Sequence, residues 1–216
     1  MTAIGALGTA AFGLVDATKQ VTQVNHVGFK RIAGTVKSLT PPSTIPNGMS
    51  QRQIVATLES NWVNGTELGN QKAIAKSLIK LNLSPANAQQ VAQTTGLDPA
   101  ALQNVADKMA ANTPLTGNEP DVLSRFDFVV TALLDETYQC ADQMYRNTTR
   151  MLAMFIAILL GVFAAIAISN NQDLRGDVVI GLIVGLLATP LAPIAKDLSS
   201  ALVTAIGAVQ SVKKKS

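Results

Sequence analysis

The chain has 216 residues, a formal net charge of +3, 14% charged residues and a single cysteine, Cys140. This length predicts one domain plus a membrane anchor, and the charged fraction is well below that of most soluble globular proteins. One cysteine excludes an intrachain disulfide and does not imply an oxidising compartment. The positive excess lies in residues 150–216, whereas a nucleic-acid-binding protein concentrates cations on a folded face. Contact with lipid headgroups or a solubilising tail accounts for this charge, and nucleic acid is not an expected partner.

The first apolar stretch is residues 1–15 (MTAIGALGTAAFGLV). No basic residue precedes it and it lacks a leucine-rich core, which disfavours a cleaved signal peptide. A membrane span needs about 20 residues, so this length favours a buried or interfacial amphipathic helix over a third membrane-embedded segment. We expect one helix over Thr2–Lys19.

Helical periodicity continues through the next hundred residues. A short helix is predicted near Val27–Leu39, and residues 40–48 (TPPSTIPNG) are predicted to form a loop because they contain three prolines and a glycine. Ser50 and Gln53 have the spacing of a capping box, which predicts that a helix begins there and ends at Asn64-Gly65. The expected core face of that helix is Ile54, Leu58 and Trp62.

A further helix is predicted over Gln71–Leu81. Its expected core face is Ile74, Leu78 and Leu81, and its expected polar face is Lys72, Lys76 and Lys80.

A small internal repeat relates residues 83–92 to residues 97–106. Each copy is expected to begin with an N-cap residue, Ser84 or Asp98, followed by a proline in the first helical position. The repeat predicts two short helices that stack as a packing module. DNA binding is disfavoured, because the second helix has no arginine or aromatic cluster.

Asp121–Ser169 contains no proline and one glycine, which predicts a single helix roughly 70 Å long that runs from the cytoplasm into the bilayer. Its first half has an apolar face too wide for an isolated stalk. We therefore expect this face to pack on other helices or on neighbouring subunits.

Two apolar runs in the last third of the chain, Met151–Ile168 and Val178–Ala195, predict a transmembrane hairpin. The loop between them carries one arginine, whereas several cations flank the hairpin, so the positive-inside rule places both flanks in the cytoplasm. The basic residues expected at the membrane interface are Arg146, Arg150, Lys213, Lys214 and Lys215. This topology gives a multi-pass protein with cytoplasmic N- and C-termini.

Small residues recur at a spacing of four in both predicted spans, a pattern that permits close helix packing in lipid. The expected helix-packing residues are Ala153, Ala157, Gly161 and Ala165 on the first span and Gly181 and Gly185 on the second. Packing within one hairpin and packing between subunits are both open. Pro190 and Pro193 are expected to break the second span, and Lys196–Val212 to form an interfacial amphipathic helix or a kinked continuation.

Catalytic, metal-binding and cofactor-binding patterns are missing from the sequence. The single histidine, His26, has no second ligand type beside it, and Cys140 has no histidine nearby. Glycine-rich nucleotide motifs are absent, and neither predicted span carries an ionisable residue. We therefore expect a protein that is not an enzyme and needs no cofactor or metal.

The stretch Asp135–Arg150 (DETYQCADQMYRNTTR), which leads into two spans, resembles a family of uncharacterised bacterial two-span inner-membrane proteins. Asn70–Pro85 (NQKAIAKSLIKLNLSP) is similar to such chains as well. The matching positions are Asp135, Tyr138, Ala141, Asp142, Gln143, Tyr145, Arg146 and Asn147, then Pro193 and Asp197. The resemblance implies a bacterial inner-membrane location and no assigned activity.

These observations predict an all-α protein in four parts. They are a cytoplasmic helical domain (1–120), a long helix leading into the membrane (121–149), a transmembrane hairpin (150–195) and an amphipathic basic segment (196–216). The expected function is that of a membrane-anchored scaffold that forms a homo-oligomer in contact with membrane lipids. The alternative is a subunit of an oligomeric pore or channel.

Overall fold

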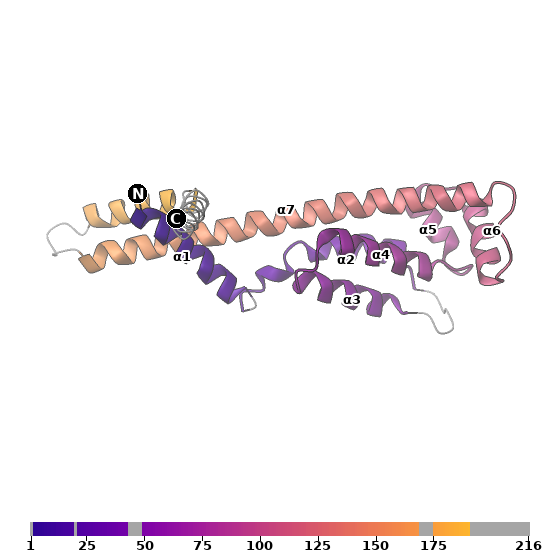
Figure 1. Ribbon diagram of the computed structural model, residues 1–216, viewed down its shortest axis with the longest axis horizontal. Helices are drawn as coiled ribbons and strands as arrows, with labels where there is room; N and C mark the ends of the chain where they lie inside the picture. The colour runs from indigo at the N-terminus through magenta and orange to yellow at the C-terminus, as the bar shows by residue number, and fades with distance from the viewer. Residues whose placement is uncertain (1, 20, 43–48, 169–174, 191–216) are drawn as a thin grey trace, which may run out of the picture. The chain divides into compact units, whose positions relative to one another are not determined.

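The computed structural model describes residues 2–19, 21–42, 49–168 and 175–190 (Figure 1). All regular structure in these ranges is helical, and they contain no strand. The expected interfacial helix over Lys196–Val212, Pro193, the lysines at 213–215 and most of the loop at 40–48 lie outside the described residues. The chain divides into two compact units, Asn25–Tyr145 and Met1–Val24 together with Arg146–Ser216.

The unit Asn25–Tyr145 is a helical bundle built on one face of a long helix. Its elements are a short 3₁₀ turn (Val24–His26), α2 (Phe29–Leu39), α3 (Gln51–Val63), α4 (Leu68–Asn82), α5 (Ala88–Thr95), α6 (Pro99–Ala110) and the first part of α7 (Glu119–Ile168). The α2 helix packs on α3, α4 and α5, and α5 packs on α6.

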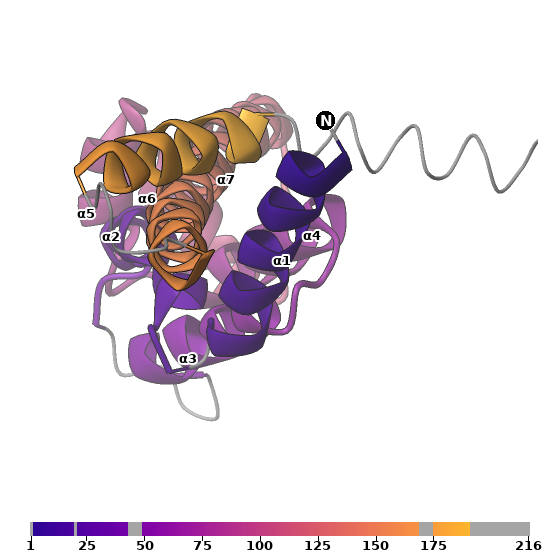
Figure 2. The ribbon, with the colours of Figure 1, turned by 90° about the vertical axis from the view of Figure 1, so that its left-hand side faces the viewer.

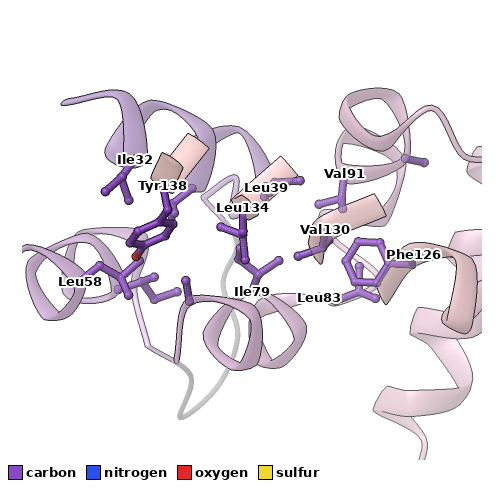
Figure 3. Close-up of a cluster of buried hydrophobic side chains, with 14 of the residues drawn as sticks. Ile32, Leu39, Leu58, Ile79, Leu83, Val91, Phe126, Val130, Leu134 and Tyr138 are labelled. Atoms are coloured by element: carbon purple, nitrogen blue, oxygen red, sulfur yellow. The ribbon is translucent and has the colours of Figure 1, made fainter. Parts of the chain in front are cut away.

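The core of this bundle runs along α7, which supplies a buried residue about every four positions (Figure 3). Phe126, Val130, Leu134 and Tyr138 are at most 1% exposed. They pack against buried residues of the other helices, among them Ile32, Leu39, Leu58, Ile79 and Val91. The wide apolar face expected on this part of the long helix is therefore covered by the chain's own helices.

Several local expectations are confirmed. The Ser50 hydroxyl accepts a hydrogen bond from the Gln53 backbone N–H, and the Gln53 side-chain oxygen accepts one from the Ser50 backbone N–H, so the capping box at the start of α3 is formed. The face of α3 that carries Ile54, Leu58 and Trp62 is buried. Asp98 caps α6 through the backbone N–H of Ala101, with proline at the first helical position.

The predicted face of α4 is only partly right, because Ile74 and Leu78 pack against the core but Leu81 does not. Its buried residues are Gln71, Ala75, Ile79 and Asn82, whereas Leu81 is 76% exposed and Ile74 and Leu78 are only partly buried. Ala75 and Ile79 enter the core from this face, and the lysines at the adjacent positions 72, 76 and 80 pair with aspartates of α7.

The predicted start of the first repeat helix is wrong. Residues 84–87 form a turn, and α5 begins only at Ala88. The side chain of Asn87 accepts a hydrogen bond from the Ser84 backbone N–H and donates to Asn82, while the Ser84 hydroxyl has no partner among the described residues. Local hydrogen bonds from an asparagine side chain to nearby groups compete with helix formation, which explains why α5 begins at Ala88 rather than after Ser84.

The second unit contains α1 (Thr2–Thr18), the apolar second half of α7 and a helix at residues 175–190 (Figure 2). The α7 helix has 50 residues without a break, about 75 Å of helix. This division groups α1 with the apolar helices rather than with the bundle helices that follow it in the chain.

Candidate functional site

The apolar half of α7 has small residues inside and large residues outside. Ala153, Ala157 and Gly161 are buried, whereas Phe155 is 58% exposed and Phe163 is 71% exposed. In the helix at 175–190 the arrangement recurs, with Gly181, Gly185 and Ala188 buried. Its exposed large side chains are Val179, Ile180, Leu182, Ile183, Leu186 and Leu187. This is the reverse of a water-soluble helix pair, in which the large apolar side chains point inward.

Among the described residues, α7 is the one helix long and apolar enough to cross a membrane. Only 17% of its most apolar stretch is buried within the chain. A core helix of a soluble protein would be mostly buried, whereas most of this stretch is not buried within the chain.

The backbones of the two apolar helices approach each other directly. A Cβ atom on Gly181 would lie 2.7 Å from the carbonyl oxygen of Gly161, and one on Gly185 would lie 2.7 Å from that of Ala157. A Cβ on Gly161 would overlap the carbonyl oxygen of Gly181. Only glycine permits this approach. The three predicted packing glycines thus meet within one chain, and Ala165 lies at the edge of the same contact.

The flanking basic residues are only partly described. Arg146 and Arg150, at the start of the apolar stretch of α7, are exposed, as an interfacial position requires. Pro190 is the last described residue of the helix at 175–190.

On the bundle unit, lysines of α4 pair with aspartates of α7. Lys76 and Lys80 lie 3.0 Å and 2.9 Å from the two carboxylate oxygens of Asp127, and Lys72 pairs with Asp135. Hydrogen bonds from Lys80 and Lys76 lower the pKa of Asp127 below its usual value of 3.8. The helical period predicts these lysines on the polar face of the helix but predicts no partner for them. Their spacing of four residues, matched by the two aspartates eight residues apart, was the available signal.

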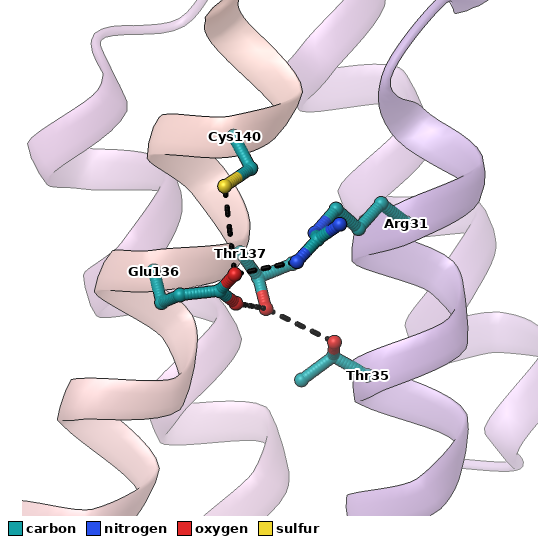
Figure 4. Close-up of polar contacts among 5 residues, drawn as sticks. All are labelled: Arg31, Thr35, Glu136, Thr137 and Cys140. Carbon is teal, nitrogen blue, oxygen red and sulfur yellow. Dashed lines mark hydrogen bonds and ion pairs between the residues drawn. The ribbon is translucent and has the colours of Figure 1, made fainter. Parts of the chain in front are cut away.

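A second polar cluster joins α2 to α7 (Figure 4). The Arg31 guanidinium donates to the Glu136 carboxylate and, with a smaller contribution from the Cys140 thiol 3.4 Å away, lowers the pKa of Glu136. The hydroxyl oxygens of Thr35 and Thr137 lie 3.0 Å apart. The cluster is a polar contact between two helices, since it contains no imidazole and its one carboxylate, with a lowered pKa, is a poor base for a thiol.

The single histidine lies elsewhere in the bundle. His26 Nδ1 is 3.1 Å from the carboxylate of Glu59, and both side chains are more than 40% exposed. Within the described ranges, no three histidine, cysteine, aspartate or glutamate side chains converge as metal ligands.

The buried end of the bundle holds three aromatic residues. Trp62 contacts Tyr138 and Tyr145 with ring centroids 6.4 Å and 6.3 Å apart, and its indole N–H donates to the Asn25 carbonyl oxygen at 2.9 Å. Burial raises the pKa of Tyr138 to about 12. These contacts fix the packing of α3 against α7 and leave the tyrosine hydroxyl protonated at physiological pH.

No family model, curated protein or solved structure matches this chain.

Proposed function

We propose that this chain is a membrane-anchored structural protein whose helical bundle is held at the membrane surface and assembles with copies of itself. The observation that carries the proposal is α7. One uninterrupted helix supplies the core residues of the bundle and, beyond Arg150, an apolar stretch of membrane length with large side chains outward. Such a helix is an anchor and a structural spine at once.

The two apolar helices are proposed to form a transmembrane hairpin. Their contact through Gly161, Gly181 and Gly185 supports this, because close backbone packing is the main source of helix association in lipid. The exposed Arg146 and Arg150 support a cytoplasmic bundle by the positive-inside rule. We also propose an inner-membrane location, which the resemblance of Asp135–Arg150 to bacterial two-span inner-membrane proteins supports.

The proposed contacts between copies use exposed apolar side chains. Phe128 on α7 is 74% exposed and Leu81 on α4 is 76% exposed, although each adjoins a well-packed core. Large apolar side chains left in water favour a protein contact. The glycines of the membrane unit are used within the chain, so the assembly does not depend on them.

The test is the mass of the full-length protein in mild detergent, measured by light scattering with the detergent subtracted. A uniform multiple of 22.6 kDa is expected, and the double variant Phe128→Ser, Leu81→Ser should lower it. Lys108→Ser on the same unit is the control and should leave the mass unchanged. A monodisperse monomer overturns self-assembly. If the assembly conducts ions in planar bilayers, the scaffold proposal is wrong and the protein is a pore subunit.

A further inference from the structure

The N-terminal helix α1 packs on the two apolar helices well inside their apolar stretches. Ala11 is fully buried with Ala157 and Ala188, and Ile4, Leu7 and Ile156 surround these three. Ala157 lies seven residues past Arg150, about 10 Å along the helix. The contact is thus at the depth of the lipid hydrocarbon rather than at the end of the span, if α7 crosses the bilayer as proposed.

The outer face of α1 carries nothing that lipid would exclude. No charged residue precedes Asp16, and the exposed positions of the helix include Ala6, Ala10 and Leu14. The exposed Thr9 donates its hydroxyl hydrogen to the carbonyl oxygen of Gly5 at 3.0 Å. Helical backbone groups are satisfied internally, and a threonine that bonds the preceding turn is satisfied as well.

Charged and hydroxyl-bearing side chains appear at the C-terminal end of α1. Asp16 lies 3.7 Å from Lys19, and the Thr18 and Thr22 hydroxyls bond preceding carbonyl groups. From Ala11 to Asp16 is five residues, about 8 Å of helix, which is close to the remaining depth from Ala157 to Arg150. The first charged residue of the chain therefore falls near the expected membrane interface.

We propose that Ile4–Val15 is a third membrane-embedded segment, docked on the two apolar helices with its outer face against lipid acyl chains. The proposal rests on the proposed membrane location of the protein. Length alone favours a buried or interfacial helix, because about 18 Å of helix is too short to cross a hydrocarbon core of about 30 Å. The contact with Ala157 and Ala188 favours an embedded segment instead. A segment that is docked on neighbouring helices is embedded without having to cross.

The test places single cysteines at matched exposed alanines in the full chain carrying Cys140→Ser, which keeps a donor toward Glu136. The test positions are Ala6 and Ala10, the lipid-facing reference is Ala164 on α7, and the aqueous reference is Ala73 on α4, all of them exposed in this chain. Each variant is spin-labelled and reconstituted into phosphatidylethanolamine and phosphatidylglycerol vesicles. Accessibility to oxygen is then compared with accessibility to a water-soluble nickel chelate.

Labels at positions 6 and 10 should show the oxygen-to-nickel ratio of position 164, well above that of position 73. A ratio equal to that of position 73 overturns the embedded helix while leaving the membrane anchor intact. Shielding from both reagents overturns the lipid contact and indicates a second protein copy on this face. Nickel accessibility at position 164 itself would overturn the membrane location and this inference together. Emission of Trp62 confirms that each variant retains the bundle.

Discussion

Gly28 occupies a position that no other residue can take without strain. It precedes α2 with a φ of +88°, and a Cβ atom there would overlap the backbone carbonyl of Ala141 on α7, lying 2.9 Å from its carbon. Two independent constraints, conformation and space, therefore require glycine. The close approach of this turn to α7 positions α2, whose residues Ile32, Val36 and Leu39 enter the core.

Gly28→Ala should lower the free energy of unfolding by at least about 2 kcal/mol, because both the backbone and α7 must move. Gly34→Ala is the matched control, since Gly34 lies inside α2 with open space around it. That change should stabilise by roughly 0.5–1 kcal/mol through helix propensity. Chemical denaturation followed by the fluorescence of Trp62 measures both. Effects of the same sign would contradict the explanation.

Asp127 predicts a specific dependence of stability on pH. Its pKa in the folded protein is lowered by Lys80 and Lys76. The stabilisation is therefore fully present above its usual pKa of 3.8, and it is lost as the pH falls through the lowered folded value.

Asp127→Asn should destabilise the bundle by about 1 kcal/mol at pH 7, the value for a partly exposed pair with two donors. The difference from the unmodified protein should shrink below pH 4 and vanish at more acidic pH. Denaturation curves between pH 2 and pH 7 give the comparison, with Asp121→Asn as an exposed control. If the difference in unfolding free energy between the two proteins does not vary with pH, the ion pairs are not its cause.

At the scale of elements, the buried face of α4 is set by its packing partners rather than by its most apolar residues. Ile79 is fully buried, whereas Leu81 is 76% exposed. Ile79→Ala should cost about 2–4 kcal/mol of unfolding free energy, because it leaves a cavity in the core. Leu81→Ala removes a comparable side chain from the surface and should change stability by less than about 0.5 kcal/mol. Denaturation followed by Trp62 fluorescence measures both variants. Equal losses of stability would show that Leu81 is part of the core face, as the helical period predicts.

The contact between α7 and the helix at 175–190 predicts an equally sharp contrast. Gly161→Leu places a side chain where the backbone of Gly181 lies, so it must separate the two helices. Ala164→Leu adds a similar side chain to an exposed position of the same helix. In detergent, thermal loss of helical circular dichroism should occur at a lower temperature for Gly161→Leu and be unchanged for Ala164→Leu. Equal melting would show that the glycine contact does not hold the helices together.

At the scale of the whole molecule, the bundle has the properties of an independent folding unit. Asn25–Tyr145 is compact and contains a continuous core of its own. A fragment of residues 25–145 should therefore be soluble and helical, and unfold cooperatively with a buried Trp62. Broad, non-cooperative unfolding of the fragment would show that the bundle depends on the membrane unit.

The same fragment tests which surface makes the proposed contact between copies. If Phe128 and Leu81 form the contact, the fragment should associate at high concentration, and the double serine variant should not. The apolar face of α7 is excluded from this contact, because Phe126, Val130, Leu134 and Tyr138 are buried within the chain.

Features that depend on residues within four positions of one another could be predicted from the sequence. The helical class, the Ser50–Gln53 capping box, the Asp98 cap and the unbroken α7 are of this kind, since caps, period and the absence of proline act locally. Three features could be recognised only in the folded chain: the buried face of α4, the requirement for glycine at position 28 and the grouping of α1 with the apolar helices. These depend on partners more than forty positions away, as in the pairing of Lys76 with Asp127, and no local pattern encodes which helix lies opposite.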